Sequence, residues 1–388
     1  MSDIKFSKEE LERYSRHLII PEFNIEGQRK LKAARVLVIG TGGLGAPLLQ
    51  YLSAAGVGTI GIVDFDVVED SNLQRQVLFT QADIGRPKVE AAKERIEAQN
   101  PHIKIVTYNT TFTSENAFEI ASNYDVIADG TDNFPTRYLV NDVSVLLKVP
   151  NVYASIFRFE GQVTVFNYGD AHGNTGPNYR DLFPEPPPPG LVPSCAEGGV
   201  IGVLPGILGS LQANEVIKVI TGVGDNLSGR LFLFDALNFE TRTLKIEKDP
   251  DNPLNGKNPT ITELIDYEQF CGLGIDKKEE REDVKGIDVT TLKSWLEGAE
   301  DIQLIDVREP YEYDIVNING QLIPQNDVLE HIDEISSDYK VVVHCRSGKR
   351  SADVIELLQT KYGFTNLYNL EGGILDWADK IDTSLPKY

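Results

Sequence analysis

The segment HCRSGKRS, residues 344–351, brings together the residue types of a reactive cysteine site. Cys345 follows the apolar run 341–343, which is typical of a buried strand, and a helix is expected to begin near Ser351. Backbone amides in a short loop between a strand and a helix form a nest for anions, and the helix N-terminus adds positive potential. These surroundings stabilise a thiolate or a persulfide. The sequence therefore predicts that Cys345 is catalytic and not a buried structural cysteine.

Positive charge is concentrated in the same loop. We expect the residues after the cysteine to form the anion-binding part of the site, and they are Arg346, Ser347, Gly348, Lys349 and Arg350. A cysteine that carries a persulfide would be held by such a loop. A cysteine-based phosphatase is the alternative, because it also closes a cysteine loop with an arginine.

A second cluster begins at the glycine-rich segment GTGGLG. Gly40, Gly42 and Gly45 stand in the G-x-G-x-x-G spacing, and Gly43 lies beside them. Such a turn between a strand and a helix lets the backbone approach a phosphate, whose charge the helix N-terminus favours. Asp64 follows at the distance along the chain where a ribose hydroxyl is bound. Taken alone, these residues predict a dinucleotide site and an NAD-dependent oxidoreductase.

The residues after Asp64 are not typical of a dehydrogenase. They add a carboxylate, an amide and two cations, which are Asp66, Asn72, Arg75 and Lys88. Asp132 and Asn133 follow a further apolar strand, although this pair could equally cap a helix. In a doubly wound sheet the C-terminal ends of the strands line one crevice, so these side chains are expected to meet at one ligand. Carboxylates beside cations and a phosphate site predict ATP with Mg²⁺, and Asp132 is the expected metal ligand.

Alternating segments predict how these residues are positioned, and the expected fold class is α/β. Apolar strands and helices alternate through residues 1–248, which predicts a Rossmann-like doubly wound domain. Alternating β-branched and aromatic residues around Glu160-Gly161 predict a hairpin. Residues 249–285 are rich in Asp, Asn, Pro, Lys and Glu and are expected to form a linker. Residues 286–388 return to the alternation, which predicts a second, small α/β domain.

Composition restricts the partners and the compartment. The 388 residues carry a formal net charge of −22, which argues against nucleic acid and anionic membranes as partners. No apolar stretch approaches the ~20 residues that span a bilayer, and the charged N-terminal segment does not resemble a signal peptide, so a cytoplasmic location is expected. The three cysteines, Cys195, Cys271 and Cys345, are widely spaced, which predicts neither a disulfide framework nor a four-thiolate zinc site.

Six segments, in order, resemble the ThiF/MoeB family of ubiquitin-activating-type adenylyltransferases: RYSRHLIIPEF, IGTGGLG, DFDVVEDSNLQRQ, GRPKVEAA, DGTDN and EGQVTVF. The resemblance runs from about Leu11 to Ile246. It implies an enzyme that binds ATP·Mg²⁺ and adenylates the C-terminal glycine of a small ubiquitin-like sulfur carrier ending in Gly-Gly. It also implies a homodimer through this domain, in which Arg16 reaches across to the ATP of the partner subunit.

The same resemblance implies a role for each matching residue. The glycines around Gly42 hold the nucleotide, Asp64 binds the ribose, Asn72, Arg75 and Lys88 contact the phosphates, and Asp132 binds Mg²⁺. Cys195 matches a loop cysteine that binds the carrier covalently in some relatives, so it is a candidate catalytic residue.

One departure from the family concerns zinc. Many relatives carry two C-x-x-C pairs that bind a structural zinc ion. The corresponding segments here read PNYRDL and YEQFCG, which retain only Cys271. We therefore expect no structural zinc and an unreactive Cys271.

Residues 286–380 resemble rhodanese domains, in the Cys345 loop and in the segments LIDVREPYEYDIVNINGQLIP and YNLEGGILDW. This resemblance implies that Cys345 carries a persulfide sulfur, taken from a persulfide or thiosulfate donor. Together, the two resemblances predict that one domain activates a sulfur carrier and the other converts it to a thiocarboxylate, for molybdopterin, thiamine or cysteine synthesis or for tRNA thiolation. An adenylyltransferase that modifies a natural-product peptide is the main alternative. An NAD-dependent oxidoreductase and a non-catalytic binding module are weaker ones.

Overall fold

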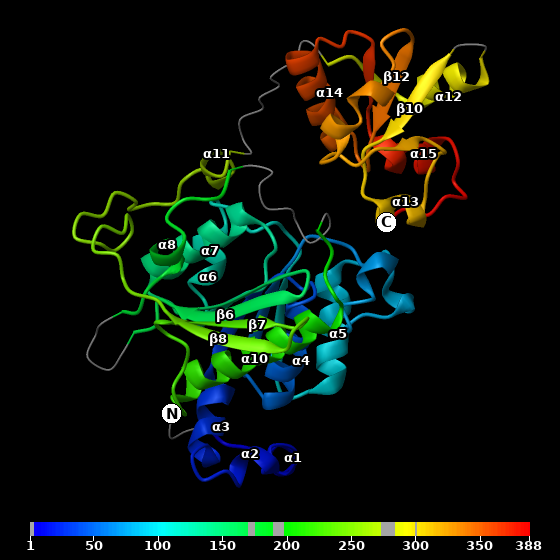
Figure 1. The fold of residues 1–388 in the computed structure, drawn as a ribbon. Coiled ribbons are helices and arrows are strands. Elements are labelled where there is room, and N and C mark those ends of the chain that lie inside the picture. The colour runs from blue at the N-terminus through cyan, green and yellow to red at the C-terminus, as the bar shows by residue number, and fades with distance from the viewer. Residues whose placement is uncertain (1–3, 170–174, 189–197, 273–283, 299–300) are drawn as a thin grey trace. The chain divides into compact units, whose positions relative to one another are not determined.

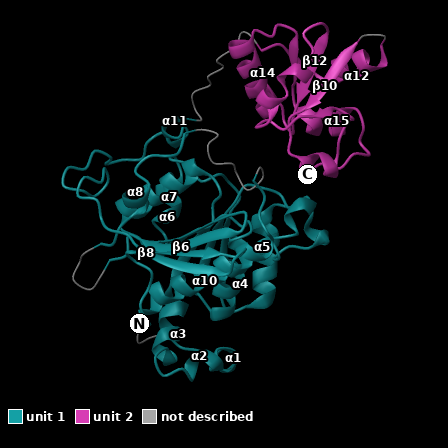
Figure 2. Cartoon of the chain, viewed as in Figure 1, with its two compact units in different colours: residues 1–275 teal, residues 276–388 magenta. Residues whose placement is uncertain are grey.

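The computed structural model describes residues 4–169, 175–188, 198–272, 284–298 and 301–388. The chain divides into two compact units, residues 1–275 and 276–388 (Figure 1, Figure 2). Each unit contains a β-sheet with apolar clusters on both of its faces. The expected α/β class is therefore confirmed for both units.

The sheet of the first unit contains a parallel half and an antiparallel half. Its described strands are β1 (Arg35–Ile39), β2 (Thr59–Val63), β3 (Lys104–Tyr108), β4 (Val126–Asp129), β5 (Asn151–Phe157), β6 (Glu160–Phe166), β7 (Arg230–Asp235) and β8 (Glu240–Lys245). They lie in the order β3-β2-β1-β4-β5-β6-β7-β8. Strands β3, β2, β1, β4 and β5 are parallel, whereas β6, β7 and β8 continue as an antiparallel meander.

Helices cover both faces of this sheet (Figure 1). The described helices are α1 (Lys8–Arg13), α2 (Ser15–Leu18), α3 (Asn24–Ala33), α4 (Gly45–Ala55), α5 (Lys88–Gln99), α6 (Ala117–Ala121), α7 (Phe134–Leu147), α8 (Tyr179–Leu182), α10 (Val203–Thr221) and α11 (Tyr267–Phe270), with 3₁₀ turns at Asp70–Asn72 and Gln81–Asp83. Val36 and Val38 of β1 pack with α4, α5 and α10, whereas Leu37 and Ile39 pack with α6 and α7. Because a parallel strand is buried on both faces, β1 is a continuous apolar run.

Two glycines fix the turn between β1 and α4. Gly40 has φ +91°, a left-handed conformation that only glycine adopts readily. A Cβ on Gly45 would lie 2.0 Å from the carbonyl oxygen of Gly40, so the helix starts directly against the end of the strand. The N-terminus of α4 is thereby held at the C-terminal end of β1.

Helix α10 differs from the expectation that no apolar segment is long enough to span a bilayer. By length and composition alone, it is the one helix among the described residues that passes that test. It packs against α3, α4 and the strands β4, β5 and β6. Its Gln212 Nε2 donates to the carbonyl oxygens of Asp129 (2.7 Å) and Val152 (2.8 Å). It is therefore a buried core helix of the first unit.

The expected hairpin is confirmed, with its turn slightly earlier in the chain, whereas the linker differs from expectation. The turn between β5 and β6 lies at residues 158–159, and Gly161 lies inside β6. Glycine is required at this position because a Cβ would lie 2.6 Å from Leu208 Cγ of α10. Residues 249–272, expected to be a linker, belong to the first unit. Leu254, Tyr267 and Cys271 are buried there. Asn252 and the hydroxyl of Tyr267 donate to Asp181 and Asp142, and composition alone does not reveal these hydrogen bonds.

The second unit is smaller and its sheet is wholly parallel among the described strands, in the order β11-β10-β12-β13-β9. The strands are β9 (Gly286–Ile287), β10 (Ile302–Asp306), β11 (Gln321–Leu322), β12 (Lys340–His344) and β13 (Leu367–Leu370). The helices are α12 (Val289–Glu297), α13 (Pro310–Ile315), α14 (Lys349–Tyr362) and α15 (Gly373–Lys380), with 3₁₀ turns at Val328–Glu330 and Ile332–Glu334. Strand β12 is central and fully apolar up to His344, so it delivers the following cysteine at the end of a buried strand.

Candidate active sites

A cleft of about 250 Å³ lies at the C-terminal ends of β1, β2 and β4. This edge of a doubly wound sheet is where nucleotides are bound in such folds. All the expected nucleotide-binding residues except Gly45 line it, and these are Gly40, Gly42, Gly43, Asp64, Asp66, Asn72, Arg75, Lys88, Asp132 and Asn133. The structure thus brings together side chains that are up to about 90 residues apart in sequence.

The glycine turn leaves room for a phosphate beside the backbone. A Cβ built on Gly42 would have Gln76 Nε2, at 3.9 Å, as its nearest neighbour, so the space before this residue is open. Asp64 lies beside the turn and is held by three hydrogen bonds. Its Oδ2 accepts from the amide of Thr41 (2.8 Å) and from Thr41 Oγ1 (2.6 Å), and its Oδ1 accepts from the amide of Asp66 (2.9 Å). A carboxylate fixed in this way suits recognition of a ribose hydroxyl.

Two cations line the other side of the cleft. Lys88 begins α5, and its Nζ donates to Asp66 Oδ2 at 2.8 Å. Arg75 Nη1 donates to the carbonyl oxygen of Ser71 at 3.0 Å. These contacts hold the two side chains near the place where a polyphosphate would lie. The side chain of Lys88 is almost completely buried. A phosphate that enters the cleft would compete with Asp66 for the ammonium group of Lys88.

The sequence analysis did not identify Gln76 and Arg137, which also line the cleft. Gln76 Oε1 and Arg137 Nε are buried and have no hydrogen-bond partner among the described residues. Buried polar atoms without partners are rare and indicate a missing ligand or water. The signal for Arg137 was present, because it lies in the first turn of the helix that Asn133 caps by accepting from the amide of Thr136 at 2.9 Å.

The donor set fits ATP with Mg²⁺. No group of three or more His, Cys, Asp or Glu side chains suited to a metal ion occurs among the residues that the structure describes. Mg²⁺ is commonly held by one or two carboxylates together with substrate phosphates, so exposed Asp132 at the rim of the cleft is sufficient on the protein side.

The structure does not place two of the expected catalytic residues in this cleft. Arg16 is exposed on α2 and is absent from the lining of the cleft. A role for Arg16 across a subunit interface remains a prediction. Cys195 lies outside the described residues.

The second candidate site is the loop after β12. Cys345 is 1% exposed, and its Sγ accepts a hydrogen bond from the amide of Gly348 at 3.1 Å. Gly348 has φ +92° and immediately precedes α14. Its amide and the N-terminus of the helix therefore both create a positive potential at the sulfur. Ser351 Oγ lies 3.4 Å from the sulfur but 2.6 Å from Asn369 Oδ1, and the shorter contact takes the hydroxyl proton.

The segment that opens α15 supports the backbone of this loop. The amide of Ile374 donates to the carbonyl oxygen of Cys345 at 3.0 Å, and the amide of Leu375 donates to that of Arg346 at 3.2 Å. A Cβ on Gly373 would lie 2.4 Å from the same Cys345 oxygen, so glycine is required there. The closing EGG segment therefore holds the cysteine loop in shape.

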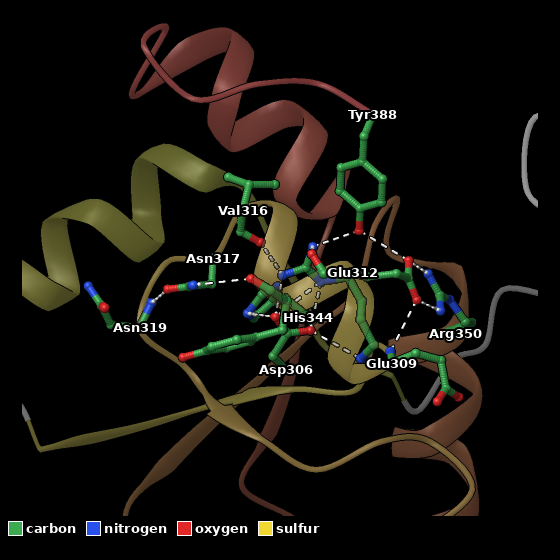
Figure 3. A network of polar contacts seen from close by, with 11 residues as sticks. Asp306, Glu309, Glu312, Val316, Asn317, Asn319, His344, Arg350 and Tyr388 are labelled. Atoms are coloured by element: carbon green, nitrogen blue, oxygen red, sulfur yellow. Dashed lines mark hydrogen bonds and ion pairs between the residues drawn. The ribbon is translucent and has the colours of Figure 1, made fainter.

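The arginines of the loop are not equivalent. Arg350 forms a two-pronged ion pair with Glu312, with both contacts at 2.7 Å (Figure 3). It is therefore already neutralised, and only four residues separate it from Cys345. A cysteine-based phosphatase, with its C-x₅-R spacing, requires this arginine to be available to the phosphate, so the arrangement disfavours that alternative. Arg346 Nε donates instead to the carbonyl oxygen of Tyr388 at 2.7 Å.

Two family profiles match the chain. The profile of the ThiF family covers residues 14–254, and that of the Rhodanese-like domain covers residues 288–380. The chain belongs to the ThiF family. It carries a rhodanese-like domain as its second unit, which is the combination that the two sequence resemblances predicted.

Curated ThiF-family relatives cover nearly the whole chain. "Probable adenylyltransferase/sulfurtransferase MoeZ" of Mycobacterium tuberculosis is 50% identical over 98% of this chain and 96% of its own length. "Adenylyltransferase and sulfurtransferase MOCS3" of Bos taurus is 42% identical over 98% of this chain and 88% of its own length. "Sulfur carrier protein adenylyltransferase" of Thermus thermophilus is 54% identical over 70% of this chain and 100% of its own length.

Solved structures support the ThiF-type fold of the first unit. A crystal structure of Escherichia coli MccB has a TM-score of 0.55 at 21% identity and covers 66% of this chain and 76% of its own. At that identity the likeness shows the fold alone.

The segment PNYRDL, one of the two where relatives bind zinc, belongs to a polar cluster, here called the Asp181 clasp (Asn178, Asp181, Asp249, Asn252 and Asn255). Cys271 of the other segment, YEQFCG, is buried in an apolar cluster instead. Asp181 Oδ1 accepts from the amide of Asp249 (2.9 Å) and from Asn252 Nδ2 (2.7 Å). Asn178 Nδ2 donates to Asn255 Oδ1 at 3.2 Å. Amide side chains are poor zinc ligands, so these residues do not fit the ion.

His344, which precedes the cysteine, is fully buried, and neither ring nitrogen has a hydrogen-bond partner within the described part of the chain. Burial lowers its pKa to about 4, although Asp306 Oδ2, 3.6 Å from Nε2, acts in the opposite direction. The unfolded chain therefore binds a proton at His344 that the folded unit excludes. Because of His344, the free energy of unfolding is highest above pH 6.5 and decreases as the pH falls toward 4.

We expect the second unit to lose about 3 kcal/mol of unfolding free energy over that interval because of His344. Both tryptophans of the chain, Trp295 and Trp377, lie in this unit, so urea unfolding followed by tryptophan fluorescence reports on it selectively. The variant His344→Leu should flatten the slope of stability against pH. The matched control His331→Gln removes a half-buried histidine whose pKa is raised by its hydrogen bond to Glu334, an effect of the opposite sign, so this variant should not flatten the slope. An unchanged slope in His344→Leu would contradict the assignment.

Proposed function

We propose that this chain is an adenylyltransferase and sulfurtransferase that converts the C-terminal glycine of a ubiquitin-like sulfur carrier into a thiocarboxylate. The class of enzyme follows from relatives that match along nearly the whole chain and are described as adenylyltransferase/sulfurtransferase. The observation that carries the proposal is the presence of two sites in one chain. A cation-lined cleft in the first unit is followed along the chain by a loop in which the amide of Gly348 donates to the sulfur of Cys345.

The first step is assigned to the cleft of the first unit. A terminal carboxylate oxygen of the carrier attacks the α-phosphorus of ATP, and pyrophosphate leaves with the bonding electron pair. The reaction requires in-line placement and neutralisation of charge on the phosphates. Arg75 and Lys88 supply the positive charge and Asp64 orients the ribose. Asp132 would hold Mg²⁺, which would supply further positive charge at the phosphates. Arg137 lies at the same cleft, where it adds a further cation.

The second step is assigned to Cys345. Its thiolate attacks the outer sulfur of a donor such as thiosulfate, and sulfite leaves with the electron pair of the broken S–S bond. The terminal sulfur of the persulfide then attacks the acyl carbon of the carrier adenylate, and AMP leaves. A thiol, either Cys195 or an external dithiol, attacks Cys345 Sγ and releases the thiocarboxylate, leaving a disulfide at Cys345. The amide of Gly348 stabilises the thiolate of Cys345 before it attacks the donor.

The route of the carrier tail is suggested by a second cavity of about 280 Å³ on the β5–β7 part of the sheet. Ile156 lines both this cavity and the nucleotide cleft, so the two are adjacent. A narrow Gly-Gly tail suits such a passage, because it has no side chains to exclude. A homodimer with Arg16 at the partner's ATP, and a cytoplasmic location, are further parts of this proposal.

A peptide-modifying adenylyltransferase is less well supported. Its support would be the likeness to MccB, one of whose structures is described as a complex with N-formylated MccA. That likeness is at 22% identity and covers 63% of this chain. It leaves the Cys345 loop without a role.

The proposal is tested by intact-mass spectrometry of a candidate carrier ending in Gly-Gly. The carrier is incubated with the full chain, ATP·Mg²⁺, thiosulfate and a dithiol. Replacement of one oxygen by sulfur, dependent on both ATP and thiosulfate, is the expected result. A carrier that is adenylated but never gains sulfur would remove the role of the second unit. Absence of adenylate with every carrier tested, but its formation on a short peptide, would favour the peptide-modifying alternative.

We further propose that the Asp181 clasp takes the structural place of zinc. Purified protein should contain far less than one zinc per chain by elemental mass spectrometry, and chelation by EDTA should leave its unfolding temperature unchanged. The variant Asn252→Ala should lower the unfolding free energy of the first unit by about 1–3 kcal/mol, because it removes a buried amide and its hydrogen bond to half-buried Asp181. Calorimetry measures this loss, and tryptophan fluorescence checks that the second unit is unaffected.

The matched control for the clasp is Asn258→Ala, which changes an exposed asparagine of the same segment. It should alter the stability very little. One zinc ion per chain, or destabilisation by EDTA, would contradict the proposal.

A further inference from the structure

The sulfur of Cys345 lies beside a buried serine and asparagine that the sequence analysis did not identify. Ser351 Oγ is 3.4 Å from Cys345 Sγ and 2.6 Å from Asn369 Oδ1. Ser351 is fully buried, Cys345 is 1% exposed and Asn369 is 9% exposed. Within the described part of the chain, these two atoms are the side-chain partners of the Ser351 hydroxyl. The hydroxyl has one proton, so it donates to one of them at a time.

One βαβ unit places the three residues together. Strand β12 ends immediately before Cys345, and α14 carries Ser351 in its first turn. Strand β13 pairs in parallel with β12 and carries Asn369. Side chains alternate along a strand, so Asn369 points to the same face as Leu367, which packs with apolar residues of α14. The contact between Asn369 and Ser351 therefore follows from the alternation along β13.

The charge on the sulfur decides which partner receives the hydroxyl proton. A neutral thiol is a weak acceptor, so the hydroxyl of Ser351 donates to the amide oxygen of Asn369 while Cys345 is protonated. A thiolate is a charged acceptor, and hydrogen bonds to charged groups are roughly twice as strong as neutral ones. The hydroxyl then turns to the sulfur. Only its hydrogen has to move, because the oxygen is already in contact with both partners.

We propose that Ser351 and Asn369 form a hydrogen-bond switch, in which Ser351 donates to the sulfur of Cys345 only while that sulfur is an anion. Ser351 touches a reacting atom and is therefore a catalytic residue. Asn369 acts through Ser351, as the alternative acceptor of its proton, and is a positioning residue. This inference rests on the proposed function of Cys345.

The switch follows the charge through the first half of sulfur transfer. The thiol of Cys345 loses its proton to water, and the hydroxyl of Ser351 turns to the thiolate. Sγ attacks the outer sulfur of thiosulfate, a new S–S bond forms, the S–S bond of the donor breaks, and sulfite leaves with its electron pair. The negative charge of the persulfide lies on the outer sulfur, so the hydroxyl returns to Asn369. A hydroxyl held permanently on Sγ would instead favour the thiolate over the persulfide.

The test is the rate at which neutral iodoacetamide alkylates Cys345 in the full chain, measured against pH by mass spectrometry of the Cys345 peptide. A cysteine reacts as its thiolate, so the midpoint of the profile reports the stability of that anion. Ser351→Ala should move the midpoint upward by about one pH unit, a tenfold loss of thiolate stability, because the donor is lost. Asn369→Leu should move it downward by about half a unit, because the hydroxyl has no competing acceptor.

The controls separate this effect from a change of charge or of folding. Both substitutions keep the titratable groups near the loop, which are His344, Arg346, Lys349, Arg350, Glu312 and Glu371. The matched control Ser337→Ala changes an exposed serine of the second unit and should keep the wild-type profile. Urea unfolding followed by tryptophan fluorescence checks that each variant is folded. If Asn369→Leu does not fold, Asn369→Ala replaces it, with the same expected direction.

A double-mutant cycle tests whether Asn369 acts through Ser351. If it does, adding Asn369→Leu to Ser351→Ala should not move the midpoint further. An unchanged midpoint in Ser351→Ala would overturn the inference. An upward shift in Asn369→Leu would also overturn it, because Asn369 would then support the serine and not compete for its proton. The proposed function fails separately, if the wild type transfers no sulfur from thiosulfate to cyanide in a Cys345-dependent manner, whereas the alkylation profiles still decide whether the switch exists.

Discussion

The variant Cys345→Ser is expected to abolish thiocarboxylate formation while ATP–pyrophosphate exchange continues at the wild-type rate. The sulfur of Cys345 accepts the amide hydrogen of Gly348 and lies at the N-terminus of α14, where an anionic sulfur is stabilised. A serine hydroxyl can accept the same hydrogen bond, but it cannot form a persulfide. Removal of an enzyme's nucleophile lowers turnover by more than about 10³-fold. Sulfur transfer from thiosulfate to cyanide should be lost to the same extent.

The matched control is Cys271→Ser in the first unit. Cys271 is buried, and burial raises its pKa to about 11, so it is a protonated thiol at neutral pH. It should not contribute to sulfur transfer, and its replacement should leave both activities in place. Thiocarboxylate formation by Cys345→Ser at more than a few per cent of the wild-type rate would show that the sulfur travels by another residue. A parallel loss of pyrophosphate exchange would indicate instead that the variant is misfolded.

The nucleotide cleft was largely predictable from the sequence, because its residues stand in fixed positions relative to regular elements. A parallel strand buried on both faces is a continuous apolar run, and the residue after such a run must lie at the C-terminal edge of the sheet. Gly40, Asp64 and Asp132 all follow such runs. The same local rule, applied to three separate segments, therefore places their residues in one cleft without knowledge of the tertiary contacts.

Contacts between distant segments were not predictable in this way. The charge-rich loop after Cys345 contains three cations in sequence, but Arg350 is cancelled by Glu312, which lies 38 residues earlier. Arg346 is oriented by Tyr388, 42 residues later. Neither partner carries a local signal, because a tyrosine or a glutamate is usually a surface residue. The residues that decide how the loop binds anions therefore became visible only in the folded unit.

The expected linker is a second case in which contacts between distant segments could not be predicted from the sequence. A segment rich in Asp, Asn and Pro is usually solvated, and residues 249–285 were interpreted in that way. In the structure, Asn252 is buried because Asp181 accepts its amide hydrogen. A polar composition indicates that burying the segment would cost free energy. It does not reveal whether a hydrogen-bond partner elsewhere in the chain offsets that cost.

The variant Asp132→Asn is expected to lower ATP–pyrophosphate exchange by about 10²–10³-fold, the effect of removing one electrostatic contact to a charged transition state. Asp132 is the exposed carboxylate that follows β4 at the edge of the cleft, and asparagine keeps its shape while removing its charge. Because Mg²⁺ prefers charged oxygen ligands, the variant should also require a higher Mg²⁺ concentration for half-maximal exchange. Titration of exchange against Mg²⁺ measures both effects.

Sulfur transfer from thiosulfate to cyanide by Asp132→Asn should match the wild type, because that reaction uses the second unit alone. This outcome is the reverse of the one expected for Cys345→Ser, so each variant controls for misfolding in the other. Asp225→Asn, which removes an exposed carboxylate of the first unit outside the cleft, should leave exchange unchanged. If Asp132→Asn exchanges pyrophosphate at the wild-type rate and with the wild-type Mg²⁺ requirement, the metal is held elsewhere. The cleft would then bind the nucleotide through its cations and glycines without a protein carboxylate on the ion.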